Sequence, residues 1–532
     1  MKRREFLLSM AAGAVLPACT SSASLPQGQL LAPSMALGHK LRGYDFPPAS
    51  RTRKVDIAIV GGGVAGLSAA WQLARAGGAD FQLFELESST GGNARSGQNA
   101  TSAYPWGAHY LPLPGKEALF VRELLADLGV LQGDPYAANP RYDERYLCFA
   151  PQERLYKNGI WQEGLLPQIG ATAIDQAQYQ RFFQLINQLQ TRVGRDGKRA
   201  FALPMALSSQ DADLLVLDNI SMCDYLYQHR LTSEPLHWYV NYACRDDYGT
   251  DYRLVSAWAG LHYFASRDGH GLHTDSDAVL TWPEGNAWLT QRMAEQVQSH
   301  IVTNALVHRI TTSKVGVSVD VFDSVHQQTT RWQAKQVIFA APAMLLPHIW
   351  ANPDGVYAAQ STSYAPWLVA NLSVKQTPQD NNGAELAWDN VIYNSPALGY
   401  VVATHQNLRA SPAPSVLTYY YALSQLTPQV ARQKLLNTSQ SAWADTILQD
   451  LSTAHPYLRD SVTQLDVFRW GHAMARPLVG FLQQPARLQL AHGKYSHIQF
   501  AHADASGFSI FEEANYRGVM AAMRAIKNLE MS

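Results

Sequence analysis

The distribution of apolar and polar residues changes character several times along the chain. Residues 55–60 form a short run rich in valine and isoleucine, which is typical of a strand covered on both faces. Residues 65–76 are rich in alanine and leucine and predict a helix, and residues 81–85 predict a second short strand. Together the three segments predict a βαβ unit.

The pattern between residues 116 and 280 is mostly helical. Leu119, Leu124, Leu125 and Leu128 recur at helical spacing, and a similar periodicity returns over 179–189. Further strands are predicted over 315–322, 336–340, 367–374, 415–421 and 497–501, the fourth with tyrosines 419–421 on alternating faces. The domain that contains the βαβ unit is therefore expected to be assembled from separated pieces of chain.

The N-terminus has the features of an export signal. Arg3 and Arg4 precede an uncharged stretch over 6–16 that is too short to span a bilayer and that ends at Pro17. This arrangement resembles a twin-arginine signal, which implies export to the periplasm. Residues 16–19 are similar to a lipoprotein processing site except for Pro17, so a lipidated, membrane-attached Cys19 and an unmodified Cys19 both stay open.

Residues 20–53 are rich in Ser, Pro, Gly and Leu without periodicity, and we interpret them as a linker between the signal (1–19) and a fold that starts near Lys54. The chain of 532 residues is long enough for about two to four domains. Its net charge of -1 gives no basic surface for nucleic acid, so we expect a small-molecule partner. Cys19, Cys148, Cys223 and Cys244 form no CxxC pair, which favours free thiols.

A glycine-rich motif lies at the junction of the first predicted strand and helix. Gly61, Gly63 and Gly66 match GxGxxG, with Val64 and Ala65 at the start of the helix. Gly61 would permit the tight turn, Gly63 would let a pyrophosphate approach the backbone, and Gly66 would allow close packing of helix and strand. Glu85 ends the next strand and would accept the ribose hydroxyls. These residues predict a dinucleotide site but do not distinguish NAD from FAD.

The segments that follow resemble flavin amine oxidases and phytoene desaturase-like enzymes. Gly91, Gly92 and Arg95 are similar to the diglycine-arginine motif of that superfamily, and residues 106–109 to its segment beneath the flavin ring. The resemblance implies FAD, with Gly107, Ala108 and His109 at the cofactor. No cysteine or histidine lies where a flavin linkage can be argued from the sequence, so we expect FAD to be bound non-covalently. Arg95 would place its guanidinium beside the pyrophosphate.

The resemblance extends to two later parts of the chain. Val307 would contact FAD through its backbone, Asp504 would bind the ribitol, and the amide of Phe511 would point from a helix N-terminus at the flavin. The matching pieces, 54–115, 281–345 and 466–532, are expected to form a doubly wound, Rossmann-like FAD domain of α/β class. Residues 116–280 and 346–465 would form an interleaved α+β substrate domain.

The sequence departs from amine-oxidising members of this superfamily at the substrate end. No lysine occurs over 364–371, Ile510 occupies the position of one cage tyrosine, and the second cage position falls near Gly480 or Phe481. Trp470 matches a family tryptophan, and we take Trp470 and His109 as candidate catalytic residues. The aromatic-rich stretches 238–242 and 258–264 either line a pocket or pack in the core.

Three functions therefore stay open. The first is hydride transfer from an amine, such as a polyamine, to flavin N5, with oxygen or an electron carrier as the acceptor. The second is FAD-dependent desaturation or isomerisation of a hydrophobic molecule, and the third is a flavin-binding protein without turnover. His262, His270 and His273 lie near three aspartates, Asp268, Asp275 and Asp277, but their spacing matches no metal-ligand set, so we expect a solvated loop and no metal.

Overall fold

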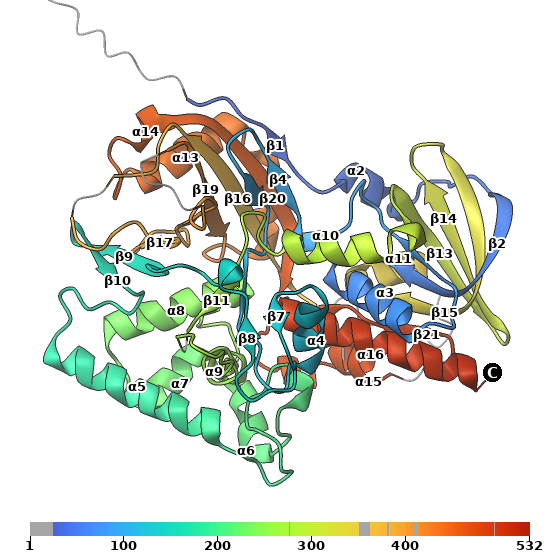
Figure 1. Ribbon diagram of the computed structural model, residues 1–532, viewed down its shortest axis with the longest axis horizontal. Helices are drawn as coiled ribbons and strands as arrows, with labels where there is room; N and C mark the ends of the chain where they lie inside the picture. The colour runs from blue at the N-terminus through green and yellow to red at the C-terminus, as the bar shows by residue number, and fades with distance from the viewer. Residues whose placement is uncertain are drawn as a thin grey trace, which may run out of the picture.

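The computed structural model describes residues 25–275, 277–350, 362–379, 382–407, 413–493 and 495–531. The predicted export signal and Cys19 lie outside these ranges. Two large mixed sheets stand side by side, and a group of helices covers one end of the molecule (Figure 1). No helix among the described residues has both the length and the apolar character needed to cross a membrane.

The first sheet has seven strands, in the order β12-β3-β2-β15-β14-β13, with β21 beside β15. Its strands are β2 (Ala49–Val60), β3 (Phe81–Phe84), β12 (Ile301–Val302), β13 (Ala305–Ser313), β14 (Gly316–Asp323), β15 (Gln328–Phe339) and β21 (Ile498–Phe500). β2 runs parallel to its neighbours β3 and β15, β12 runs parallel to β3, and β21 runs parallel to β15. The strands β13, β14 and β15 form an antiparallel meander. This sheet confirms the predicted βαβ unit and its assembly from distant pieces.

Both faces of the first sheet are covered, which explains the continuous apolar run in β2. Ile57 and Ile59 pack against helices on one face, and Ala58 and Val60 pack into a second core on the other. The helices of the first face include α3 (Val64–Ala76), α4 (Leu119–Asp127), α10 (Ala287–Gln296) and α16 (Phe511–Glu530). Short helices α11 (Leu346–Ile349) and α15 (Pro485–His492) contribute to the opposite side.

The second sheet has eight strands, in the order β1-β20-β16-β19-β18-β17-β9-β10. They are β1 (Leu30–Leu31), β20 (Val462–Ala475), β16 (Tyr364–Val374), β19 (Ser415–Ala422), β18 (Tyr400–Val402), β17 (Asp389–Ile392), β9 (Glu153–Lys157) and β10 (Ile160–Glu163). Helices α12 (Pro428–Asn437) and α13 (Gln440–Leu451) cover one face. Tyr419 and Tyr421 point to that face and Tyr420 to the other, which confirms the predicted alternation.

Helices from the middle of the chain form a separate core. Helix α5 (Ala173–Thr191) begins at a capping box made by Thr172 and Asp175. It packs with α7 (Met222–Gln228), α8 (Glu234–Tyr248) and α9 (Ala257–Ala265). The remaining short elements are α2 (Met35–Gly38), α6 (Ala212–Leu215), α14 (Leu458–Ser461), β4 (Ser96–Gln98), β5 (Ala103–Pro105), β6 (Tyr110–Pro112), β7 (Leu131–Gln132), β8 (Arg141–Tyr142) and β11 (Val279–Thr281).

Three boundaries differ from the sequence prediction. Residues 25–53 are not a free linker, because β1 pairs with β20 and β2 already begins at Ala49. The start of the predicted FAD segment at residue 466 falls inside β20, which belongs to the second sheet. The helical region also contributes a hairpin, β9 and β10, to that sheet. In each case pairing with strands far away in the chain decides the structure, and local periodicity carries no record of such partners.

Candidate functional site

A cavity of about 930 Å³ opens at the carboxyl ends of β2, β3 and β15. Three lining residues mark these ends: β2 ends at Val60, β3 ends at Phe84, and Ala340 directly follows the end of β15. This edge of a parallel sheet is where open α/β folds bind ligands, because loops and helix N-termini converge there. The volume lies within the range of small-molecule and cofactor sites. We call this space the large cavity.

The glycine-rich turn forms one end of the large cavity. Gly61 adopts a φ of +101°, and a Cβ on Gly66 would lie 1.9 Å from the Gly61 carbonyl oxygen. Both positions therefore require glycine for the turn itself. A Cβ on Gly63 would meet only the Cα of Gly92, at 3.8 Å. Gly63 thus borders open space in the cavity, as expected for a residue that a phosphate approaches.

The N-terminus of α3 supplies unpaired donors at the same place. Gly63 is the N-cap and has no side chain to satisfy the first N–H groups of the helix. The Gly91 loop lies against this turn, since the Gly91 N–H donates to the Gly62 carbonyl at 2.8 Å. Two glycine-rich turns and a helix N-terminus therefore surround one space. The arrangement fits an anion such as a diphosphate.

Three charged residues lie beside the turn. Glu85 accepts hydrogen bonds from the N–H groups of Gly62 at 2.7 Å and Glu87 at 2.9 Å, and burial raises the pKa of its carboxyl. Arg95 lies 3.2 Å from Glu87, and its buried Nε has no hydrogen-bond partner among the described residues. An unpartnered guanidinium nitrogen at the cavity wall costs free energy unless a ligand accepts from it. Arg95 therefore fits the predicted contact to a pyrophosphate.

Most predicted cofactor residues border the cavities. Those on the large cavity are Gly61, Gly63, Val64, Ala65, Glu85, Gly91, Gly92, Arg95, Ala108, Val307 and Phe511. Gly107 and His109 line a smaller cavity next to it. Gly66 lies behind the turn, as its packing role requires.

Asp504 lies behind the cavity wall. Its Oδ2 accepts hydrogen bonds from the Tyr364 hydroxyl at 2.5 Å and from the Ala343 N–H at 2.8 Å. Burial opposes ionisation, but His502 and these donors keep the pKa of the Asp504 carboxyl below its ordinary value. His502 and Ala503 line the cavity instead. The predicted contact of Asp504 with the ribitol stays a prediction.

A second cavity of about 140 Å³ continues from the large one, and we call it the small cavity. The two share the lining residues Asn93, Ala108, Asn286, Trp470, Ala473, Ser509, Ile510 and Phe511. The N-terminus of α16 therefore lies where the two spaces meet, and no side chain caps it. A ring system that reaches this junction would meet a positive helix end.

Aromatic side chains form the walls of the small cavity. The ring of His109 stacks on Tyr420 at 4.3 Å, and the Tyr420 hydroxyl donates to the Gly107 carbonyl at 3.0 Å. The Trp470 indole N–H donates to the Trp106 carbonyl at 2.6 Å, so this group is already occupied and Trp470 contributes a ring surface. Trp367 completes the wall. The structure thus brings Trp470 and His109 together, and Tyr420 and Trp367 are additions that the sequence did not reveal.

His109 is uncharged in this environment. Burial lowers the pKa of its imidazole to about 3. It therefore presents an uncharged ring to the small cavity at physiological pH. It does not act as a cation there.

Acidic side chains form the remaining wall of the small cavity. Asp246 and Asp247 lie at the end of α8, and Glu512 lies in the first turn of α16. Arg267 donates to Asp247 at 2.5 Å, so this pair is neutral overall. Asp246 accepts from the Tyr110 hydroxyl at 3.2 Å, and no cation pairs directly with Asp246 or Glu512 among the described residues. Burial raises the pKa of both carboxyls to about 7.

The predicted departures from the superfamily pattern are visible in the cavities. Ile510 lines both spaces, whereas Phe481 is buried in the helical core. The stretches 238–242 and 258–264 pack mainly in cores, and none of their side chains lines either cavity. Neither cavity is lined by a lysine or a cysteine in the part of the chain that the structure describes.

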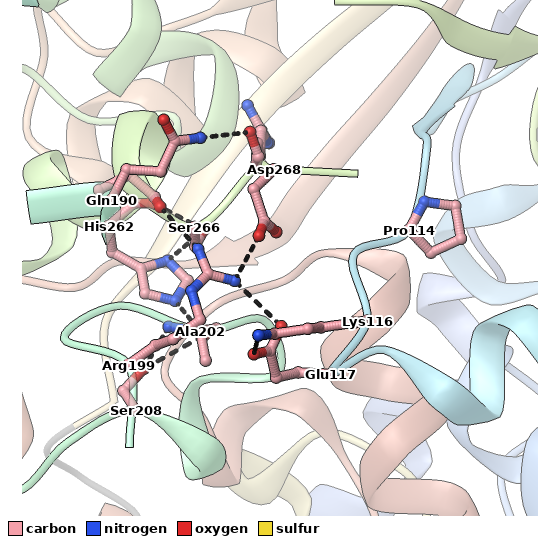
Figure 2. Close-up of polar contacts among 12 residues, drawn as sticks. Pro114, Lys116, Glu117, Gln190, Arg199, Ala202, Ser208, His262, Ser266 and Asp268 are labelled. Carbon is pink, nitrogen blue, oxygen red and sulfur yellow. Dashed lines mark hydrogen bonds and ion pairs between the residues drawn. The ribbon is translucent and has the colours of Figure 1, made fainter. Parts of the chain in front are cut away.

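The prediction of a solvated loop is wrong for His262, which is buried in a helix, and Asp268 is held in an ion pair. His262 lies in α9, where its Nε2 is 2.8 Å from the Ala202 carbonyl, and burial lowers the pKa of its imidazole to about 3. Asp268 pairs with Arg199 at 2.8 Å, and Arg199 also contacts Glu117 (Figure 2). Within the described ranges, no three His, Cys, Asp or Glu side chains are grouped so that they could hold a metal ion.

Comparisons with known proteins give the family and the fold of the chain. The sequence model of the flavin-containing amine oxidoreductases matches residues 64–526. No curated protein sequence gives a significant match. Putrescine oxidase bound to putrescine has a similar structure, with a TM-score of 0.64 and 16% identity over 90% of this chain and 100% of the other.

Two further solved structures share the fold. Cyclohexylamine oxidase from Brevibacterium oxydans has a TM-score of 0.64 and 15% identity over 90% of this chain and 100% of the other. A fatty acid isomerase from P. acnes has a TM-score of 0.62 and 15% identity over 88% and 98%. At these identities the structural likenesses establish the fold alone.

Proposed function

Because this chain belongs to the family of flavin-containing amine oxidoreductases and is an FAD-dependent enzyme, we propose that it oxidises a cationic amine in the small cavity. The observation that carries the proposal is the pair of carboxyls, Asp246 and Glu512, on an aromatic-walled space that continues from the dinucleotide site. Bound FAD supplies the acceptor for a hydride that leaves a substrate carbon. Oxygen or an electron carrier would be the final acceptor of the electrons taken from the substrate.

Residues of the large cavity would hold the cofactor without a covalent bond. The α3 N-terminus, the Gly91 loop and Arg95 fit the diphosphate, and Glu85 borders the position expected for a ribose. The backbone at Val307 fits the adenine end. The uncapped N-terminus of α16 at Phe511 fits the flavin end, where positive potential stabilises the negative charge of a reduced ring.

The residues of the small cavity suit an amine in two respects. Ionised Asp246 and Glu512 attract an ammonium group, and few counter-charges compete with it. Hydride leaves the carbon next to nitrogen most easily when the nitrogen is uncharged, so the site must also favour the neutral amine. The buried rings of Trp470 and Tyr420 disfavour the charged form of the amine, and a carboxyl with a pKa near 7 can take the proton.

We expect primary amines and polyamines to bleach the flavin when they are mixed with the protein without oxygen. Reduction should quicken as the pH approaches the pKa of the amine, because the neutral fraction grows. Trp470→Ala should slow it about tenfold, which corresponds to about 1.4 kcal/mol of barrier, and Trp470→Phe should slow it less because a ring remains. Stopped-flow absorbance of the flavin measures both effects.

The same experiment distinguishes the oxidation of an amine from the rival functions. The wall of the small cavity is largely aromatic, and a fatty acid isomerase shares the fold, so a hydrophobic substrate is the second candidate. A flavin that stays oxidised with a broad amine panel, while an unsaturated fatty acid or polyene is converted, would replace the amine proposal with desaturation or isomerisation. A flavin that responds to neither class would favour a binding role.

We further propose that Arg3 and Arg4 direct export of the protein to the periplasm. The support is the sequence alone: the arginine pair directly precedes a short uncharged stretch. Replacing both arginines with lysine keeps the charge and removes the guanidinium groups. The variant should accumulate unprocessed in the cytoplasm, as judged by fractionation and its mobility on a gel. Normal processing of the variant would refute the assignment.

A further inference from the structure

We propose that residues 30–42, which we call the strap, form an additional wall of the FAD site and slow the release of the cofactor. The strap leaves the second sheet at β1, passes α2 and reaches β2 of the first sheet (Figure 1). It contributes the cavity-lining residues Ala32, Pro33, Ser34, Met35, Gly38, His39, Leu41 and Arg42. The match to the family begins only at residue 64, so the strap lies outside it.

The strap is fixed on both sides of the large cavity. At its start, Leu30 and Leu31 pair with β20, and the Arg469 guanidinium donates to the carbonyls of Leu31 and Leu435 at 3.4 and 3.3 Å. Beyond its end, the ring of Phe46 stacks on His308 at 4.1 Å. The segment therefore links the two sheets across the cavity, and a ligand below it is covered.

The middle of the strap is hydrogen-bonded to Glu87, in the loop that follows β3 at the cofactor site. The Ser34 N–H donates to one oxygen of Glu87 at 2.7 Å, and the Ser34 hydroxyl donates to the other at 2.8 Å. Glu87 in turn lies 3.2 Å from Arg95. A carboxylate at the rim of a diphosphate site repels the ligand unless its charge is satisfied. Ser34 and Arg95 together satisfy the charge of Glu87. The position of the strap over the cavity and the orientation of Arg95 therefore depend on the same carboxylate.

The strap also brings positive charge to the cavity. Arg42 of the strap and Arg432 of α12 both line the cavity, and both lie near His472 of β20, since burial and these two charges lower the pKa of its imidazole to about 4. No carboxylate pairs with Arg42 or Arg432 in the described part of the chain. Unpaired cations around one cavity favour an anionic ligand, and the diphosphate of FAD carries two negative charges. The closed strap therefore stabilises bound FAD both by covering it and by its potential.

The rate of FAD release tests the strap directly and needs no amine substrate. Removing the hydroxyl in Ser34→Ala should speed release about tenfold, followed as the rise in free-flavin fluorescence after dilution, because one of two bonds to a charged partner is lost. Ser34→Thr should restore slow release. Ser50→Ala, which removes a bond from Ser50 to the Thr329 carbonyl on β15, is the matched control and should behave like the unchanged protein.

Limited trypsin digestion gives a second measurement on the unchanged protein. Lys40 and Arg42 lie in the strap, so cleavage there should be slow with FAD bound and at least about tenfold faster in the apoprotein, because the opened segment is the form that is cut. Equal release from Ser34→Ala and the unchanged protein, or equal cleavage of the strap with and without FAD, would overturn the proposal. Neither result would bear on the oxidation of amines.

Discussion

Purified Gly63→Val protein is expected to be folded but colourless. A Cβ at this position would make only an ordinary van der Waals contact, with the Cα of Gly92 at 3.8 Å, and the rest of the valine side chain would occupy the space where a diphosphate meets α3. The steric overlap and the lost N–H contacts should weaken the binding of FAD by more than about 100-fold, or about 3 kcal/mol. The flavin absorbance of the purified variant and titration of its apoprotein with FAD measure the loss.

Two comparisons make the result specific. The apoproteins of Gly63→Val and of the unchanged sequence should unfold at similar temperatures, whereas Gly66→Ala should fold poorly because its methyl would strike the Gly61 carbonyl. Acid precipitation of the unchanged protein should leave FAD in the supernatant, because the groups that fit the cofactor, the α3 N-terminus, Arg95 and Glu85, would hold it by hydrogen bonds and charge. A yellow Gly63→Val protein would contradict the cofactor site, and flavin in the pellet would contradict non-covalent binding.

Replacement of Asp246 by Asn is expected to weaken amine binding by about 30-fold or more, because loss of one partner of a buried charge pair costs about 2 kcal/mol or more. The pKa of Asp246 is raised to about 7 by burial, so the unchanged enzyme should lose affinity for amines as the pH falls below 7 and this carboxyl becomes neutral. Asp246→Asn should lack that part of the pH dependence. The amine concentration that half-saturates flavin reduction, measured from pH 6 to 9, reports both effects.

The same substitution should stabilise the protein in the absence of amine. The pKa of Asp246 rises from 3.8 to about 7 on folding, so the folded state holds more protons than the unfolded state between these values. Stability is therefore lost as the pH rises through this window, and asparagine removes the loss. Asp246→Asn should melt at a higher temperature than the unchanged protein at pH 8, with no difference below pH 3.8. The control is Glu295→Gln, which replaces an exposed carboxyl on α10. Equal amine affinity in Asp246→Asn and Glu295→Gln would count against the acidic wall.

The cofactor end of the site could be predicted because its signal is local. Gly61, Gly63 and Gly66 act within one strand-to-helix turn, and the turn has the same shape whatever surrounds it. The βαβ unit was also visible, because a strand covered on both faces leaves a continuous apolar run. The resemblance to a family added the Gly91 loop, and the structure places that loop against the same turn.

The substrate end could not be predicted in the same way. Asp246 and Glu512 come from helices α8 and α16, and only the packing of the two places both carboxyls on one cavity. In the sequence each is one acidic residue among many. The strap was missed for a related reason: its two-residue strand and its bonds to Glu87 need partners far along the chain, and a segment without periodicity resembles a linker.

The position of α16 sets the time at which the cofactor can be taken up. This helix follows every other described element along the chain, yet it packs on α3, with the Asn515 amide donating to the Ser68 hydroxyl at 3.1 Å, and its first residue borders both cavities. During synthesis the glycine-rich turn emerges early, but its cavity lacks one end until α16 has left the ribosome. A chain that stops short of residue 511 would lack the helix end that borders both cavities. Retention of flavin therefore reports that synthesis has passed α16 and that this helix has docked.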